Sequence, residues 1–109
     1  MNILNIIGNL TGDPETRVIE NGDTVVTFTV ACNRRGENAG ADFVRVSAWG
    51  GCGTACAKYL SKGKKVYVSG PVRVRAWLDD NGTARASLEM TAREVEFLTP
   101  RGQEAADDE

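Results

Sequence analysis

The 109-residue sequence predicts an all-β domain with a single helix, and three observations favour this fold class. Apolar and polar residues alternate with a period of two in several segments, most clearly in "VRVRAW" at 72–77, as expected for strands with two different faces. Asn21-Gly22 and the "DDNG" run at 79–82 place typical turn residues between such segments. Only "GTACAKYLSKG" at 53–63 has helical spacing. The chain length fits one domain with a modest core.

The first half of the chain is predicted to form strands. "ILNIIGNL" at 3–10 is β-rich, and "TGDPE" at 11–15 follows as a turn. The segment 18–32 is expected to form two strand pieces around Asn21-Gly22, with alternate residues of the second piece on one face, namely Val26, Phe28, Val30 and Cys32. A polar loop from Arg34 to Asp42, expected to be mobile, leads into the alternating strand "FVRVSAW" at 43–49.

The predicted helix follows that strand. Four residues recur at helical spacing, Thr54 is the candidate N-cap and Gly63 the expected stop; the four are Ala55, Cys56, Tyr59 and Leu60. A long strand at 64–77 comes next, with a bulge or bend expected at Gly70-Pro71 because proline cannot donate to a β-ladder.

The last strand, at 83–98, changes the face of its apolar residues near Arg93 or Glu94, which predicts a second bulge. Five strands with one helix between the third and the fourth match the five-stranded Greek-key barrel known as the OB-fold. Gly8 and Gly70-Pro71 lie where two bends of such a barrel are expected. The barrel domain is predicted to span residues 1–99.

Residues 100–109 are predicted to form a short, acidic, disordered tail. This end of the chain has no apolar anchors, and a single Arg101 stands against four acids, namely Glu104, Asp107, Asp108 and Glu109. The start of the chain has no basic leader, and no run of about 18 apolar residues occurs. We therefore expect a cytoplasmic, nucleoid-associated protein without membrane contact.

The composition argues against an enzyme. The chain has no histidine, no Walker A loop and no GxSxG motif, and its carboxylates are scattered through turns and solvent faces. Its three cysteines include no CxxC pair, so no metal site and no cofactor are expected. Cys32, Cys52 and Cys56 are expected to be reduced, small, buried apolar side chains. The sequence predicts no catalytic residue.

Two strands beside the helix predict a binding surface instead. Phe43, Arg45 and Trp49 share one face of 43–49, and Arg73, Arg75 and Trp77 share one face of 72–77. Val44, Val46 and Ala48 of the first strand and Val72, Val74 and Ala76 of the second are expected to line the barrel interior, which directs the arginines and aromatic rings outward. Such a surface suits single-stranded nucleic acid, because unpaired bases stack on rings and phosphates attract guanidinium groups.

Further basic residues are expected to support this surface. A surrounding positive field comes from Arg34, Arg35, Lys62, Lys64 and Lys65, and Arg85 joins the candidate DNA contacts. For Trp49 the residues alone leave two roles open, because a tryptophan next to the "GGCG" run could pack under a neighbouring element instead of facing a ligand.

Several stretches of the chain together form a recognisable pattern: "GNLTGDPE" near the start, "FVRVSAWG", "YLSKGKKVYVSG", the "DNG" turn and the final strand. With these stretches at the family spacing, the chain resembles the bacterial single-stranded DNA-binding protein family over roughly residues 2–98. The resemblance implies an OB-fold homotetramer that acts in replication, recombination and repair, although a homodimer remains an alternative. It also places Phe43, Trp49 and Trp77 at base-stacking positions.

The chain departs from this family pattern in two places. Well-studied members have a further stacking tryptophan just after the second strand, where this chain has "NRRGENAG". The sequence leaves two alternatives open: Arg34 or Arg35 substitutes for it, by cation stacking or by a phosphate contact, or this contact is missing. The family usually continues into a long linker with an acidic tip that docks replication and repair proteins, whereas this chain stops at "DDE". The sequence therefore leaves open whether replication and repair proteins are recruited by that route.

The resulting hypothesis is sequence-tolerant binding and protection of single-stranded DNA, by base stacking on aromatic rings and phosphate contacts of arginine and lysine. The alternative is an OB-fold protein-interaction module, such as a primosome-type accessory factor with weak nucleic-acid binding. The sequence does not decide whether DNA or RNA is bound. It also leaves open the oligomeric state, the size of the binding site and whether the gene is of chromosomal, plasmid or phage origin.

Overall fold

The structure is a computed structural model that describes residues 1–36 and 40–98. Eight strands and one helix follow one another as β1 (Leu4–Leu10), β2 (Glu15–Val18), β3 (Thr24–Asn33), β4 (Ala41–Trp49), α1 (Gly50–Tyr59), β5 (Lys65–Gly70), β6 (Val72–Leu78), β7 (Ala84–Thr91) and β8 (Glu94–Phe97). The predicted acidic tail at 100–109 and residues 37–39 of the predicted mobile loop lie outside the described residues.

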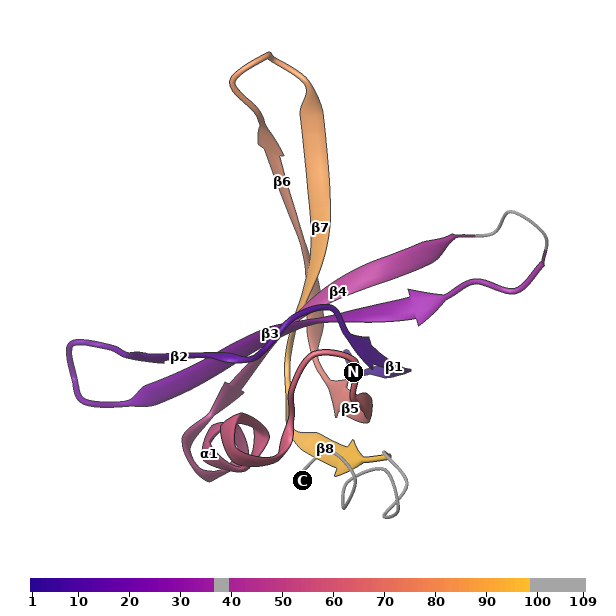
Figure 1. The fold of residues 1–109 in the computed structure, drawn as a ribbon. Helices are drawn as coiled ribbons and strands as arrows, with labels where there is room; N and C mark the ends of the chain where they lie inside the picture. The colour runs from indigo at the N-terminus through magenta and orange to yellow at the C-terminus, as the bar shows by residue number, and fades with distance from the viewer. Residues whose placement is uncertain (37–39, 99–109) are drawn as a thin grey trace.

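These strands form one closed sheet (Figure 1). β1 pairs with β3 and β5, β3 pairs with β2 and β4, and β4 runs parallel to β7. β7 also pairs with β6, and β8 with β5. β1 and β2 pair with successive parts of β3, β5 continues into β6, and β7 continues into β8. Each of these three pairs corresponds to one long, bent strand, which gives five long strands in a sheet that closes on itself. The predicted all-β OB-fold, with its helix between the third and fourth long strands, is confirmed.

The core lies inside this barrel and is built by alternate residues of the strands. The fully buried side chains are mainly small and branched: Val26, Val30, Val46, Val66, Val68 and Cys56. Cys56 and Leu60 bring the end of the helix into this cluster, whereas Tyr59 is exposed and stacks obliquely on Phe97, with ring centroids 5.6 Å apart. Among the described residues, no polar or charged residue is buried as a whole.

Both predicted breaks in the later strands are present. β5 ends at Gly70 and β6 starts after Pro71, while β7 ends at Thr91 and β8 starts after Arg93. The two breaks face each other, since Thr91 N donates to Pro71 O at 3.1 Å and Arg93 N to Ser69 O at 2.8 Å. A Cβ atom at Gly70 would collide with the carbonyl oxygen of Thr91, so only glycine allows this close approach.

The predicted start of the helix is wrong. The helix begins at Gly50 with Trp49 as its N-cap residue, and no side chain caps it. Thr54 lies inside the helix, where its hydroxyl donates to Gly50 O at 3.1 Å. The helix also ends before the predicted stop, at Tyr59, and Gly63 instead adopts a positive φ in the following turn. Among the described residues, no helix is long and apolar enough to cross a membrane.

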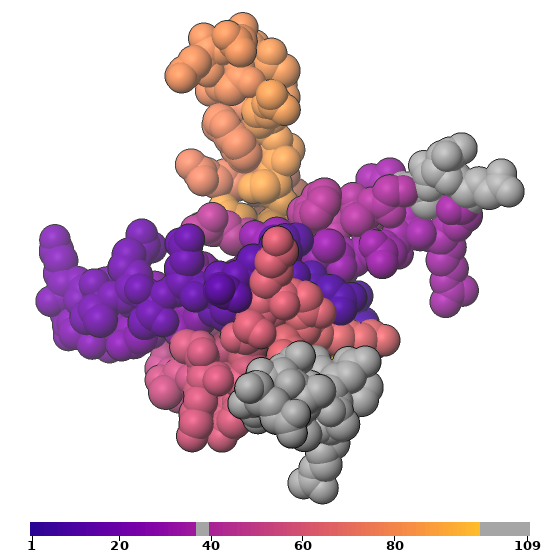
Figure 2. Space-filling model, viewed as in Figure 1, coloured from indigo at the N-terminus to yellow at the C-terminus, as the bar shows by residue number. Residues whose placement is uncertain are grey.

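Three two-stranded arms extend from the barrel: β2 with β3, the outer ends of β3 and β4, and β6 with β7 (Figures 1 and 2). The position of the β6–β7 arm corrects one prediction. Val72 packs against the core, but Val74 is 66% exposed and Ala76 is exposed, so neither lines the barrel interior. The side chains of β6 alternate between its two faces as predicted, but most of the strand lies beyond the barrel.

Candidate nucleic-acid interface

The two faces of β4 differ as the sequence predicts. Val44, Val46 and Ala48 point into the barrel and are at most 2% exposed. On the other face, Phe43 is 58% and Trp49 is 42% exposed, and the intervening Arg45 is also exposed. Each of these three side chains is therefore adjacent in sequence to at least one residue of the core, namely Val44, Val46 or Ala48, which fixes the strand backbone beside it.

The β6–β7 arm repeats this chemistry on one of its faces. Cross-strand partners place Arg73 opposite Glu89, Arg75 opposite Ser87 and Trp77 opposite Arg85. Trp77 is 40% exposed, and the guanidinium carbon of Arg75 lies 5.2 Å from the centre of its ring. This is the distance of a cation–π contact, which orients the ring and keeps a positive charge beside it.

The parallel pairing of β4 with β7 joins these two faces into one. Arg45 is the partner of Glu89 and Ser47 that of Thr91, so the row Arg73–Glu89–Arg45 runs across three adjacent strands. Directly paired residues point to the same side of a sheet. We call this shared face the stacking surface; it consists of Phe43, Arg45, Ser47, Trp49, Arg73, Arg75, Trp77, Arg85, Ser87, Glu89 and Thr91.

Two open grooves border this surface. One has a volume of about 420 Å³, and Trp49, Arg73 and Glu89 contribute to its lining. The other has a volume of about 380 Å³ and runs between the arm that carries Phe43 and the arm that carries Leu88. Trp49 and Phe43 therefore each line an open groove. Trp49 is thus partly exposed and not sealed under a neighbouring element, and its contact with a ligand stays a prediction.

The charged residues of this region fall into two groups. Arg34 donates from Nε (3.0 Å) and Nη2 (2.6 Å) to Asp42 Oδ1, and Arg85 Nε donates to Asp79 Oδ2 at 2.9 Å. The contact with Arg34 lowers the pKa of Asp42, chiefly through the hydrogen bond.

Arg45, Arg73 and Arg75 belong to the second group: within the described part of the chain they form no ion pair, which leaves their charges available to a ligand.

Glu89 is a residue of this surface that the sequence reasoning missed. Its Oε1 atom is buried and has no hydrogen-bond partner among the described residues. A buried carboxylate oxygen without a donor is costly, and here it lies between two arginines in the strand register. The same alternation that singled out Arg73 and Arg75 could have found it, because Glu89 shares the parity of Arg85 in the last strand.

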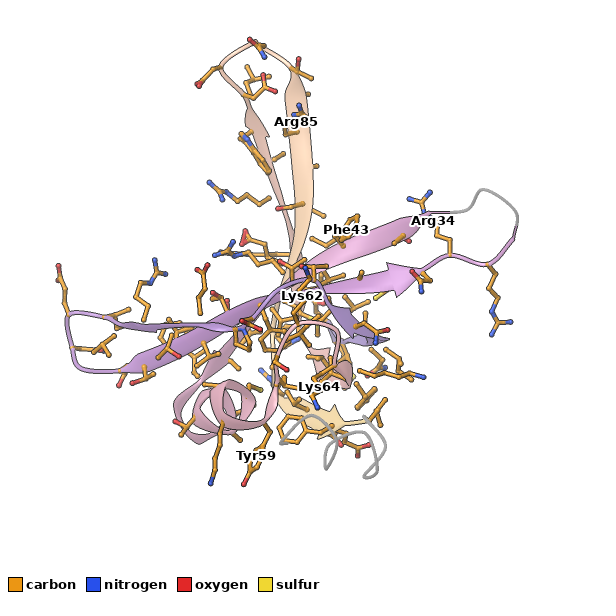
Figure 3. All side chains as sticks on the ribbon, in the orientation of Figure 1. Arg34, Phe43, Tyr59, Lys62, Lys64 and Arg85 are labelled. Carbon is orange, nitrogen blue, oxygen red and sulfur yellow. The ribbon has the colours of Figure 1, made fainter. Side chains whose placement is uncertain are left out.

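Four predicted site residues are not part of the stacking surface: Arg34 lines the second groove, and the other three lie farther away. Lys62 and Lys64 belong to the connection between α1 and β5, where the Lys62 amide donates to Asp13 Oδ1 at 2.9 Å. Figure 3 shows both lysines away from Arg85, and neither lines the two grooves. Arg35 is exposed at the end of the β3–β4 arm. Whether these residues contact DNA stays a prediction.

The cysteines have ordinary structural positions. Cys56 is buried, whereas Cys32 and Cys52 are only partly buried, so the expectation of burial holds fully for one of the three. Burial raises the pKa of Cys56 to about 12, with a smaller effect of Cys52, which keeps it a thiol. In the described part of the chain, no three histidine, cysteine or acidic side chains are grouped as a metal site would require.

This sequence is similar to those of known proteins over nearly its whole length. The model of the single-strand binding protein family matches residues 1–98. The single-stranded DNA-binding protein 2 of Chlorobaculum tepidum is 37% identical, over 100% of this chain and 78% of the relative. The protein of the same name in Clostridium acetobutylicum is 41% identical, over 90% of this chain and 77% of its own. The chain therefore belongs to the single-strand binding protein family.

Proposed function

We propose that this chain binds single-stranded DNA on the stacking surface, with little dependence on base sequence. The observation that carries the proposal is the register of β6, β7 and β4, which brings Trp77, Phe43 and Trp49 to one side of a continuous sheet. Arg45, Arg73 and Arg75 lie between these rings. Exposed rings alternating with guanidinium groups match the alternation of bases and phosphates in an unpaired strand.

Binding would replace one set of non-covalent contacts with another, and no covalent bond would form or break. Bases leave one another and stack on the three rings, while the arginines without ion pairs replace the counterions of the phosphates. A double helix hides its base faces, so it can use only the phosphate contacts. The bound strand is thereby kept from reannealing and from nucleases. This activity suits replication, recombination and repair in the cytoplasm, at the nucleoid.

We also propose that the protein is a homotetramer, with a homodimer as the alternative. Apolar side chains are exposed along β1 and just before it: Ile7 of β1 and Ile3, which precedes the strand, are each 55% exposed. Ile7 is paired with Tyr67 of β5, whose hydroxyl donates to Asn5 Oδ1 at 3.0 Å. This outer patch is formed by strands other than β4, β6 and β7, so association through it leaves the stacking surface free.

Tryptophan fluorescence tests the proposed function, because Trp49 and Trp77 are the only two tryptophans. Titration with a short oligo-dT is expected to quench the emission, whereas duplex DNA of the same length should quench it far less. Trp77→Ala is expected to weaken oligo-dT binding by about 1–3 kcal/mol, or roughly 5- to 150-fold, without unfolding the protein.

Tyr59→Ala provides the matched control, since Tyr59 is an exposed aromatic residue on α1 (Figure 3). It should leave affinity unchanged. An emission that stays constant through saturating oligo-dT would instead favour an OB-fold protein-interaction module as the function. Equal losses in both variants would show that the stacking surface is not the binding site.

A further inference from the structure

The groove beside Trp49 lies at the base of the β6–β7 arm, where β6 and β7 leave the barrel next to β4 (Figure 1). Its volume of about 420 Å³ is more than one nucleobase fills. The indole of Trp49 forms part of the wall. The polar residues that line the groove are Asn2, Ser47, Arg73, Glu89 and Thr91.

Glu89 is the residue of this groove whose hydrogen-bonding capacity is unused. Its Oε1 atom is buried without a partner, and within the described part of the chain its carboxylate forms neither a hydrogen bond nor an ion pair. Arg73 and Arg45 are its neighbours in the strand register, yet neither bonds to it in the described structure. A donor supplied by a ligand would therefore remove the cost of an unsatisfied acceptor.

The other polar side chains of the groove do not select between donors and acceptors. Asn2 is held by the backbone of Val72, since its Nδ2 donates to Val72 O at 2.7 Å and its Oδ1 accepts from Val72 N at 3.1 Å. Ser47 and Thr91 face each other in the register, and a hydroxyl can rotate either to donate or to accept. An ionised carboxylate only accepts. Glu89 is thus the group that can tell one base from another.

The negative charge of Glu89 also decides which part of a DNA strand it meets. A carboxylate repels a phosphate, whereas the guanidinium groups of Arg73 and Arg45, on the strands to either side, attract one. Phosphates are therefore expected at the arginines and a base edge at Glu89. The ring of Trp49 in the same groove offers that base a flat apolar surface.

We propose that Glu89 is a specificity-determining residue, which makes this groove a subsite for a base with an exocyclic amino group. Cytosine, adenine and guanine carry such a donor. Thymine and uracil have a carbonyl oxygen where cytosine has its amino group, and the carboxylate repels it. The inference rests on the proposed function and refines it: one subsite favours amino-bearing bases, while the remaining rings stack on any base.

Competition of oligo-dC and oligo-dU against a labelled oligo-dT at neutral pH tests the role of Glu89. The two competitors have the same ring size, and their main difference is an amino group or a carbonyl oxygen at position 4. Glu89→Gln has nearly the same shape, but its amide can also donate to uracil. The ratio of dC affinity to dU affinity should fall by about 3- to 10-fold in this variant. An unchanged ratio would overturn the proposal.

Glu96→Gln is the matched control, because it removes the same charge from an exposed position of β8 that does not line the groove. Loss of a negative charge can raise the affinity for every oligonucleotide, so the ratio of the two affinities is the measurement that counts. Glu96→Gln should leave this ratio at its wild-type value. Equal falls in both variants would reveal an effect of net charge and contradict the role of Glu89.

The wild-type protein provides a test that needs no variant. Oligo-dA should bind more tightly than the same chain built from purine deoxyriboside, which differs from deoxyadenosine by the missing amino group. Equal binding of the two would count against the subsite.

Two further outcomes separate this inference from its alternatives. If Glu89→Gln changes the size of the protein in solution and leaves the dC to dU ratio intact, Glu89 serves a contact between copies and the proposal is overturned. If the wild-type protein binds oligo-dT, dC and dU but the ratio does not respond to Glu89→Gln, the inference fails and the proposed function stands. If it binds none of them, both fail.

Discussion

Asp79 organises the turn at the tip of the β6–β7 arm. Its Oδ1 accepts hydrogen bonds from the amides of Asn81 and Thr83, both at 2.9 Å, and its Oδ2 accepts the bond from Arg85. Gly82 completes the turn with a φ of 77°. The bonds from the Thr83 amide and the Arg85 side chain are the main reasons that the pKa of Asp79 lies below its ordinary value of 3.8. One carboxylate thus links the turn to a residue of the stacking surface.

Asp79→Ala is expected to loosen this turn and free Arg85. The amide of Thr83 should exchange its hydrogen faster in the variant, because it loses its acceptor. Asp80→Ala, at the next position, serves as the control and should leave that exchange unchanged. Equal protection of the Thr83 amide in wild type and Asp79→Ala would contradict the assigned role.

The lowered pKa of Asp79 determines the direction in which the stability of the folded turn changes with pH. A carboxylate with a lowered folded pKa stabilises the folded turn at pH values above 3.8, and this contribution is lost as the pH falls through the lowered value. The turn is therefore expected to be equally protected at pH 7 and pH 5 and to loosen only in stronger acid.

Single residues also show what alternation in a sequence can and cannot predict. It correctly assigned Phe43 and Trp77 to an exposed side, because side chains in a strand alternate between faces. It could not predict that Arg34 bonds Asp42 across the β3–β4 arm, since that contact depends on how two strands are paired.

At the scale of elements, the bend between β5 and β6 gives a clear prediction. Gly70→Ala should destabilise the fold by about 1–3 kcal/mol, because its Cβ meets backbone of β7 that cannot move without breaking the sheet. Gly12→Ala is the control: nothing lies within 4 Å of its Cβ position, and the expected change stays within about 0.5 kcal/mol. Similar urea midpoints for the two variants would contradict this account.

Elements marked by covalent constraints were the easiest to predict. The break at Gly70-Pro71 follows from proline's missing amide hydrogen, and the hairpin at Asn21-Gly22 follows from the positive φ that Gly22 adopts. The helix start was missed because no capping side chain marks it: the chain turns directly from β4 into α1 at Gly50. Because no local residue preference marks the start of the helix, tertiary packing determines where it lies.

At the scale of the whole molecule, the barrel was predictable but the reach of its arms was not. Alternating valines are equally consistent with a barrel interior and with a face left for another molecule, so the sequence alone placed Val74 and Ala76 inside the barrel. The pairing of β7 with β4 decides the matter, because it ends at Leu88 and leaves the outer half of the arm on its own. That geometry produces the stacking surface and leaves Val74 and Ala76 exposed.

The central claim is that the stacking surface binds the phosphates and bases of single-stranded DNA. The salt dependence of the affinity tests this claim most directly. The affinity for a short oligo-dT should fall linearly on logarithmic axes with salt concentration, by a slope of about 0.7 for each phosphate contacted. Arg75→Ala should make the slope shallower by about 0.7, whereas Arg17→Ala, an exposed arginine of β2, should leave it unchanged. A wild-type affinity insensitive to salt, or an equal change in both variants, would contradict the claim.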